Sequence, residues 1–190
     1  MKPIEKEMAM FNSYFNSQFK SDIPLLDSAL KYVSEGAGKK MRPMLLLLVA
    51  KCLGDVSTKA LAAASAMEML HTASLLHDDV IDESDKRRGR ESLNVVYNNN
   101  IAVLVGDYIL SQALNNAATA RDYKIVEELS ILGKALSRGE LMQFDIRQKI
   151  SDRKYHIARR TISMSSSARQ PLFLSAVVHV LHTLPMPMMS

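Results

Sequence analysis

Residues 75–89 read LLHDDVIDESDKRRG, and this segment decides the fold. Asp78 and Asp82 are four residues apart, so on a helix they share one face about one turn apart. Apolar side chains fill other positions of the segment, namely Leu75, Leu76, Val80 and Ile81. We therefore expect a helix that is buried on one side and lines a cleft with its carboxylates.

Asp79 brings the carboxylates within residues 78–82 to three. Carboxylates this close repel one another unless a cation lies between them, and Mg²⁺ commonly binds through carboxylates together with substrate phosphates. Arg87 and Arg88 follow, and guanidinium groups pair bidentately with phosphate oxygens. The segment therefore indicates a magnesium site for a phosphorylated substrate. The alternative is a solvated helix end, with Asp82 paired to Lys86.

Apolar spacings of three and four residues predict helices over most of the chain. The predicted ranges are 4–19, 25–34, 43–53, 58–82, 101–119 and 124–150, with one more from Tyr155 onward. Pro43 fits the first position of its helix, and Gly89 fits a stop after the aspartates. Since the sequence has no strand-like alternation and no hairpin signal, the predicted fold class is all-α.

The composition is typical of one ordinary domain. The 190 residues are 47% hydrophobic and 6% aromatic, and the apolar content comes from the helix formers Ala, Leu and Met. Cys52 is the single cysteine, so no disulfide within the chain is possible and a cytoplasmic location is expected. The longest apolar run, residues 44–50, has seven residues. Because a bilayer span needs about 20, we expect no transmembrane segment.

The net charge of +4 is unevenly distributed. Residues 153–190 hold five basic and no acidic side chains, which leaves 19 of the 24 basic ones and all 20 acidic ones before them. The basic balance therefore belongs to the tail. Because no basic stripe is interleaved with aromatic residues, we expect no nucleic-acid partner.

A second basic group lies at residues 38–43, which read GKKMRP. Lys39 and Arg42 follow a glycine turn at a helix start, where anions are favoured. His71 lies seven residues before Asp78, which is about two helical turns on roughly the same face. A solvated loop and a core histidine are the alternatives. Together, two anion sites facing one metal site indicate a reaction of two phosphorylated substrates, or one with a diphosphate leaving group.

These motifs in combination resemble the trans-isoprenyl diphosphate synthases, the polyprenyl synthetase family. The resemblance rests on residues 38–43, 71–82 and 87–89, continues through GDYILS at 106–111 and GELMQ at 139–143, and covers about residues 5–160. Terpene cyclases also carry an aspartate-rich motif, but they lack the lysine–arginine loop. The resemblance implies an isoprenoid-synthase-type helical bundle around a central cavity, of the long-chain type, and a homodimer.

The resemblance also implies a reaction, in which isopentenyl diphosphate condenses with an allylic prenyl diphosphate to give an all-trans polyprenyl diphosphate. It implies four groups of residues: Asp78, Asp82 and Asp79 for Mg²⁺; Lys39, Arg42, His71 and Arg88 for isopentenyl diphosphate; Arg87 and Gln143 for the allylic diphosphate; and Ala73 and Ser74 for product length. Since Ala73 and Ser74 are small, a product longer than farnesyl is expected.

The chain departs from the family near its end. The family has a second aspartate-rich motif, but here no acidic residue follows Asp152, and Arg160 stands where the family has lysine. We expect residues 1–160 to be the N-terminal part of a polyprenyl synthase domain and 161–190 to be frame-shifted or otherwise non-native. We also expect uncovered apolar surface and little or no activity from this chain alone. A non-catalytic partner subunit of a heteromeric synthase is the alternative, and a plain helical interaction protein is a third hypothesis.

Overall fold

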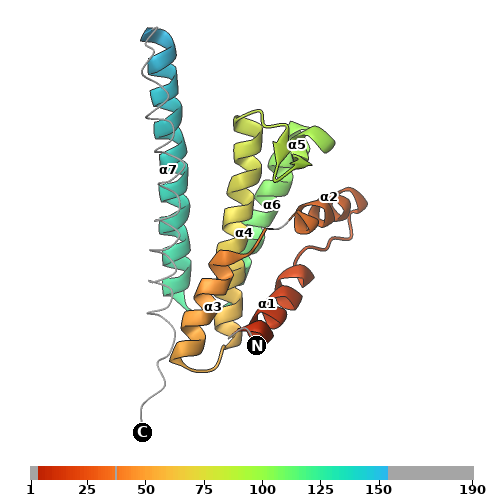
Figure 1. The fold of residues 1–190 in the computed structure, drawn as a ribbon, viewed down its shortest axis with the longest axis vertical. Helices are drawn as coiled ribbons and strands as arrows, with labels where there is room; N and C mark the ends of the chain where they lie inside the picture. The colour runs from red at the N-terminus through yellow and green to blue at the C-terminus, as the bar shows by residue number, and fades with distance from the viewer. Residues whose placement is uncertain (1–3, 37, 154–190) are drawn as a thin grey trace.

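The computed structural model describes residues 4–36 and 38–153, and the expected helix from Tyr155 and the atypical tail lie outside them. The described part is helical apart from one short hairpin, which confirms the all-α prediction (Figure 1). The helices are α1 Glu5–Ser17, α2 Pro24–Glu35, α3 Met41–Leu53, α4 Thr58–Ile81, α5 Leu93–Val96, α6 Asn99–Thr119 and α7 Tyr123–Arg153. The strands are β1 Lys86–Arg87 and β2 Arg90–Glu91.

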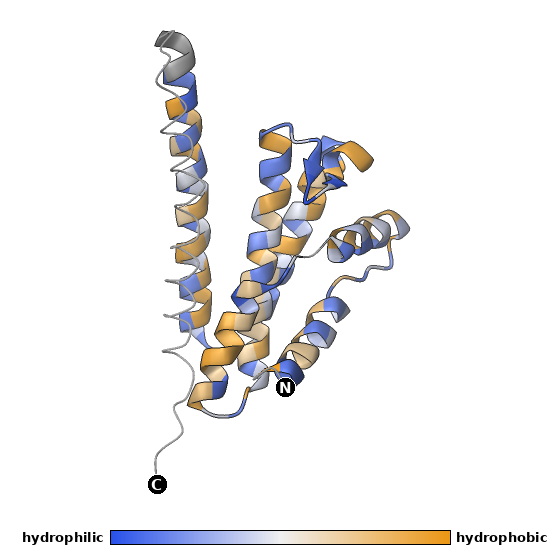
Figure 2. Ribbon diagram, viewed as in Figure 1, coloured by the Kyte–Doolittle hydropathy of each residue, from blue (hydrophilic) through white to orange (hydrophobic). Residues whose placement is uncertain are grey.

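Helices α4 and α6 form the centre of the molecule and pack along each other. Both helices carry fully buried small side chains, namely Ala62, Ala64 and Ala66 of α4 and Ala113 and Ala117 of α6. Helices α1 and α3 cover α4, and Figure 2 shows α3 as almost continuously apolar. The hairpin and α5 lie at the end where α4 finishes and α6 begins (Figure 1).

A buried amide connects three of these helices. Asn116 of α6 is 2% exposed. It accepts a hydrogen bond from Tyr14 Oη of α1 at 2.9 Å, and its Nδ2 lies 3.5 Å from Met69 Sδ of α4. Nδ2 also donates to the Gln112 carbonyl at 2.9 Å. Because its polar atoms are paired, Asn116 joins the helices without the penalty of an unsatisfied buried group.

The helix boundaries follow local capping chemistry. Ser57 caps α4 by accepting a hydrogen bond from the Ala60 amide at 3.2 Å, and Asn98 caps α6 in the same way from the Ile101 amide at 3.0 Å. Helix α3 begins at Met41, so the prediction that Pro43 is its first residue was wrong. Proline is tolerated there because amides of the first turn have no intrahelical partner.

The expectation of no hairpin was also wrong. Lys86 pairs with Glu91, and Arg87 pairs with Arg90. The two residues between them, Arg88 and Gly89, have φ of 53° and 81°. Positive φ at both central positions matches the twist of a two-residue hairpin. The sequence signal was weak, because arginine is unusual at such a position and each strand has two residues.

Helix α7 runs beside α4 and extends beyond the other helices (Figure 1). Its distal part carries exposed apolar side chains, with Leu141, Met142 and Phe144 exposed by 71%, 56% and 58%. Among the described residues, no helix has both the length and the apolar content that a bilayer crossing requires.

Candidate functional site

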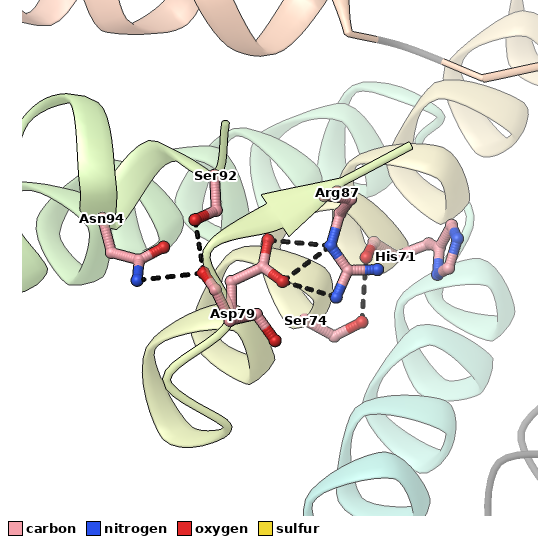
Figure 3. A network of polar contacts seen from close by, with 7 residues as sticks. His71, Ser74, Asp79, Arg87, Ser92 and Asn94 are labelled. Carbon is pink, nitrogen blue, oxygen red and sulfur yellow. Dashed lines mark hydrogen bonds and ion pairs between the residues drawn. The ribbon is translucent and has the colours of Figure 1, made fainter. Parts of the chain in front are cut away.

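The hairpin is held against the end of α4, and this positions Arg87 and Arg88. The Ser84 amide donates to the Asp79 carbonyl at 2.9 Å. The side chains of Ser92 and Asn94 both donate to the Ser84 carbonyl (Figure 3). These bonds fold the chain back just after the aspartates, so the arginines return toward α4.

Asp79 and Arg87 form a bidentate ion pair (Figure 3). Arg87 Nε lies 2.8 and 2.7 Å from the two carboxylate oxygens, and Nη2 lies 2.6 Å from Oδ1. The hydrogen bonds that Arg87 donates to Asp79 raise the pKa of the Arg87 guanidinium. Asp79 is therefore turned to the hairpin, and its role as a metal ligand stays a prediction.

Asp78 and Asp82 lie at the end of α4 with different surroundings. Asp78 is 5% exposed, whereas Asp82 caps the helix and is exposed. Asp82 Oδ1 accepts a hydrogen bond from Arg147 Nη1 of α7 at 2.7 Å. Within residues 4–36 and 38–153, no group of three or more His, Cys, Asp or Glu side chains is arranged to hold a metal ion.

A pocket lies between α1, α2, α4 and the hairpin. Four of the predicted site residues line this pocket: His71, Asp79, Arg87 and Arg88. Phe15, Phe19 and Tyr32 supply apolar surface. In the view of Figure 3, His71 lies on the opposite side of the Arg87 guanidinium from Asp79. The pocket thus combines positive charge with an apolar wall, which suits a ligand with an anionic head and a hydrocarbon part.

Helix α2 fastens the hairpin from the other side. Tyr32 Oη donates to the Glu91 carbonyl at 2.9 Å, and the Arg90 guanidinium carbon lies 4.5 Å from the centre of the Tyr32 ring. Arg90 Nη2 also lies 3.6 Å from Glu35 Oε2. The hairpin is therefore held at both faces, and the position of Arg88 depends on α2 as well as α4.

The loop before α3 brings the second basic group to this region. Gly38 lines the pocket, and a Cβ atom at Gly38 would overlap the Arg88 guanidinium. Only glycine allows this close approach. Lys39 is exposed beside a neighbouring hollow, whereas Arg42 is half-buried. The lysine–arginine loop and the hairpin arginines, far apart in the sequence, are thus adjacent.

Lys40 and Glu68 are members of this site that sequence reasoning missed. Lys40 has a φ of 49° and its Nζ donates to Asn12 Oδ1 at 3.0 Å, while lying 4.7 Å from the Phe15 ring centre. Burial lowers the pKa of Lys40. Glu68 is a 7% exposed carboxylate on α4. In the sequence, the signal for Glu68 was its position as an acid between two methionines, three residues before His71.

The remaining predicted residues lie on α4 and α7. Ala73 is 1% exposed in the apolar core, and Ser74 Oγ donates to the His71 carbonyl at 2.8 Å. Gln143 is half-buried on α7, four residues before Arg147. Helix α7 therefore lies beside the end of α4 that carries Asp82, because Arg147 of α7 contacts this residue.

The His77 side chain faces α6, where its neighbours are Asp107 and Val103. Its Nε2 lies 3.3 Å from Asp107 Oδ1 and 3.4 Å from the Val103 carbonyl. A Cβ atom at Gly106 would overlap the imidazole. Packing therefore explains the glycine of the GDYILS motif, because its lack of a side chain leaves room for His77.

Comparisons with known proteins agree with this architecture. The family model for polyprenyl synthetase matches residues 23–177, so the chain belongs to the polyprenyl synthetase family. The match runs past residue 160, where the sequence resemblance was expected to stop. The boundary at 160 stays a prediction.

Individual relatives are long-chain enzymes. The chain is 38% identical over 142 residues to an octaprenyl diphosphate synthase of Haemophilus influenzae, covering 75% of this chain and 43% of that one. It is 37% identical over 144 residues to an all-trans-nonaprenyl-diphosphate synthase of Rhodobacter capsulatus, covering 75% and 44%. The crystal structure of a decaprenyl diphosphate synthase from Rhodobacter capsulatus superposes with a TM-score of 0.81 at 28% identity, covering 94% and 54%. The chain spans less than half the length of these curated relatives.

Proposed function

We propose that these residues belong to a trans-polyprenyl diphosphate synthase, which condenses isopentenyl diphosphate with an allylic prenyl diphosphate. In this reaction the allylic carbon–oxygen bond breaks and its electron pair leaves with diphosphate. A carbon–carbon bond to isopentenyl diphosphate then forms, and a proton is lost from the new chain. The observation that carries the proposal is the pocket that brings His71, Arg87 and Arg88 together beside Asp79.

The two substrates use different arginines of the hairpin. We assign Lys39, Arg42, His71 and Arg88 to isopentenyl diphosphate, and Arg87 and Gln143 to the allylic diphosphate. The location of Arg88 against Gly38 supports the first group, because it joins the hairpin to the lysine–arginine loop. The aromatic wall of Phe15, Phe19 and Tyr32 would exclude water from the carbocation.

Asp78 and Asp82 would hold Mg²⁺. They fit this metal, because it binds through one or two carboxylates together with substrate phosphates and needs no all-protein cage. When bound, the metal neutralises charge on the departing diphosphate. Asp79 supports the site indirectly, since it holds Arg87 through their bidentate contact.

We further propose a long-chain product and a homodimer. The octaprenyl and nonaprenyl relatives and the small side chain of Ala73 support the long-chain product. Exposed apolar side chains on α6, namely Val103, Leu104 and Leu114, support the second.

An incubation tests the proposal directly. The purified chain is mixed with farnesyl diphosphate, radiolabelled isopentenyl diphosphate and Mg²⁺, and binding of isopentenyl diphosphate is measured separately by calorimetry. We expect binding, but little or no product from these 190 residues alone, because no acidic residue after Asp152 is available for a second metal site. Product only after mixing with a second polypeptide would favour the partner-subunit alternative. Absence of binding would overturn the proposal.

A further inference from the structure

Glu68 is a buried acid of α4 in the pocket that Gly38 and Arg88 also line. It is 7% exposed and lines the pocket, and its Oε2 is inaccessible to solvent and has no hydrogen-bond partner among the described residues. Burial raises the pKa of Glu68, and the positive charges of Arg42, Lys40 and Arg88 oppose this rise. A buried carboxylate is costly unless it is compensated, so its place among these cations requires an explanation.

The three cations come from two separate parts of the chain. Lys40 stands at the start of α3, Arg42 lies in its first turn, and Arg88 lies in the hairpin turn. Like charges brought together in a half-buried site repel one another. Burial lowers the pKa of Arg42, the charge of Glu68 raises it, and the charge of Arg88 lowers it. Without an anion among them, the hairpin and the loop would tend to separate.

We propose that Glu68 is a positioning residue of the diphosphate site, whose buried carboxylate holds Arg42, Lys40 and Arg88 together so that they meet one ligand. The inference rests on the proposed function, because it assigns these cations to isopentenyl diphosphate. Glu68 is not a ligand-binding group in this account, since a carboxylate repels diphosphate. It acts through the cations and makes the loop and the hairpin one preorganised surface.

The sign of one substitution separates positioning from simple electrostatics. E68Q keeps the size of the side chain and removes its charge, so by Coulomb attraction alone it should bind diphosphate more tightly. Positioning predicts the opposite, namely weaker binding by on the order of tenfold. Affinity for isopentenyl diphosphate and for inorganic diphosphate is measured by calorimetry on the full chain at fixed ionic strength. E91Q is the matched control, because Glu91 is exposed at the same pocket, and it should bind equally or slightly more tightly.

Two further variants keep the test decisive if E68Q folds poorly. E68D retains the charge and should recover much of the affinity. Because Glu68 acts in part through Arg42, E68Q should weaken binding less in an R42Q background than in the unaltered chain. Binding by E68Q equal to or tighter than that of the unaltered chain, or full additivity with R42Q, would overturn the inference alone. Absence of diphosphate binding by the unaltered chain would overturn the proposed function together with it.

Discussion

The guanidinium of Arg87 contacts both carboxylate oxygens of Asp79, at 2.6 to 2.8 Å. The Asp79 side chain is 3% exposed, whereas that of Arg87 is 36% exposed. The buried partner is therefore the acid, and the arginine neutralises it while remaining accessible from the pocket. This contact connects β1 to the last turn of α4, so Arg87 stabilises the fold in addition to its proposed role with the allylic substrate.

Replacing Arg87 by alanine should destabilise the protein. The variant leaves Asp79 buried without its partner, and we expect the free energy of unfolding to fall by about 2–3 kcal/mol, somewhat less than for a fully buried pair. Urea unfolding followed by circular dichroism measures the change. K86A is the control, because Lys86 is the exposed neighbour in β1. Equal midpoints for R87A and K86A would show that the pair does not hold the hairpin.

Gly106 should respond to alanine differently from Gly139, although both are helical. A Cβ atom at Gly106 would overlap His77, whereas one at Gly139 would meet nothing within 4 Å. We expect G106A to destabilise by about 1 kcal/mol or more and G139A to stabilise by about 0.5–1 kcal/mol. Thermal unfolding of both variants checks the two signs. A stabilising G106A would mean that His77 does not pack on α6.

The helical layout was predictable because it depends on short-range periodicity. The helix over 58–82 was expected on apolar spacing, and α4 spans Thr58–Ile81. The arrangement of the aspartates was only half predictable. Asp78 and Asp82 share a face, but Asp79 is rotated by about 100° from Asp78, and this direction carries it toward the hairpin. Since the hairpin itself was missed, its contact with Asp79 could not be foreseen.

Glu68 shows a different limit of sequence reasoning. Its neighbours Met67 and Met69 are buried and apolar, so nothing local indicates a charged environment. The compensating cations come from residues 40, 42 and 88. Only tertiary packing of the loop, the hairpin and α4 brings them together, and such contacts between distant segments leave no periodic signal.

The pair of Lys59 and Asp122 should make stability depend on pH. Lys59 Nζ lies 2.9 Å from Asp122 Oδ2, and this hydrogen bond lowers the pKa of Asp122. Because the folded pKa lies below the unfolded value, the contribution is present above about pH 4 and is lost as pH falls through the folded pKa. D122N should cost about 0.5–1 kcal/mol at pH 7 and almost nothing at about pH 3. Urea unfolding at both pH values measures this.

D55N provides the comparison for that experiment. Asp55 also pairs with a lysine, Lys51 at 3.2 Å, but its side chain is fully exposed. No resolvable change in stability is expected at either pH. A loss in D122N that persists unchanged at low pH would exclude ionisation as its cause.

Ala73 provides a test of product length. It lies five residues before Asp78 and is 1% exposed. In the active synthase, A73F should shorten the products, because a bulky side chain about one turn before the aspartates would obstruct the growing hydrocarbon. Mass spectrometry of the products measures this. A64F is the control, because Ala64 is also fully buried in α4 but lies about half a turn round the helix from Ala73. Unchanged products from a folded A73F would refute the tunnel assignment.

Arg147 should compete with Mg²⁺ for Asp82. Its Nη1 lies 2.7 Å from Asp82 Oδ1, and both side chains are more than a third exposed. Binding of Mg²⁺ through this oxygen requires the ion pair to break, and an exposed pair is worth at most about 1 kcal/mol. R147A should therefore bind Mg²⁺ up to about fivefold more tightly in the presence of inorganic diphosphate. Calorimetry measures the affinity, with R138A, an exposed arginine of the same helix, as control. If R147A and R138A both bind Mg²⁺ like the unaltered chain, then either Asp82 is not a metal ligand or Arg147 does not compete with the metal. D82N distinguishes the two, because it weakens Mg²⁺ binding only if Asp82 is a ligand.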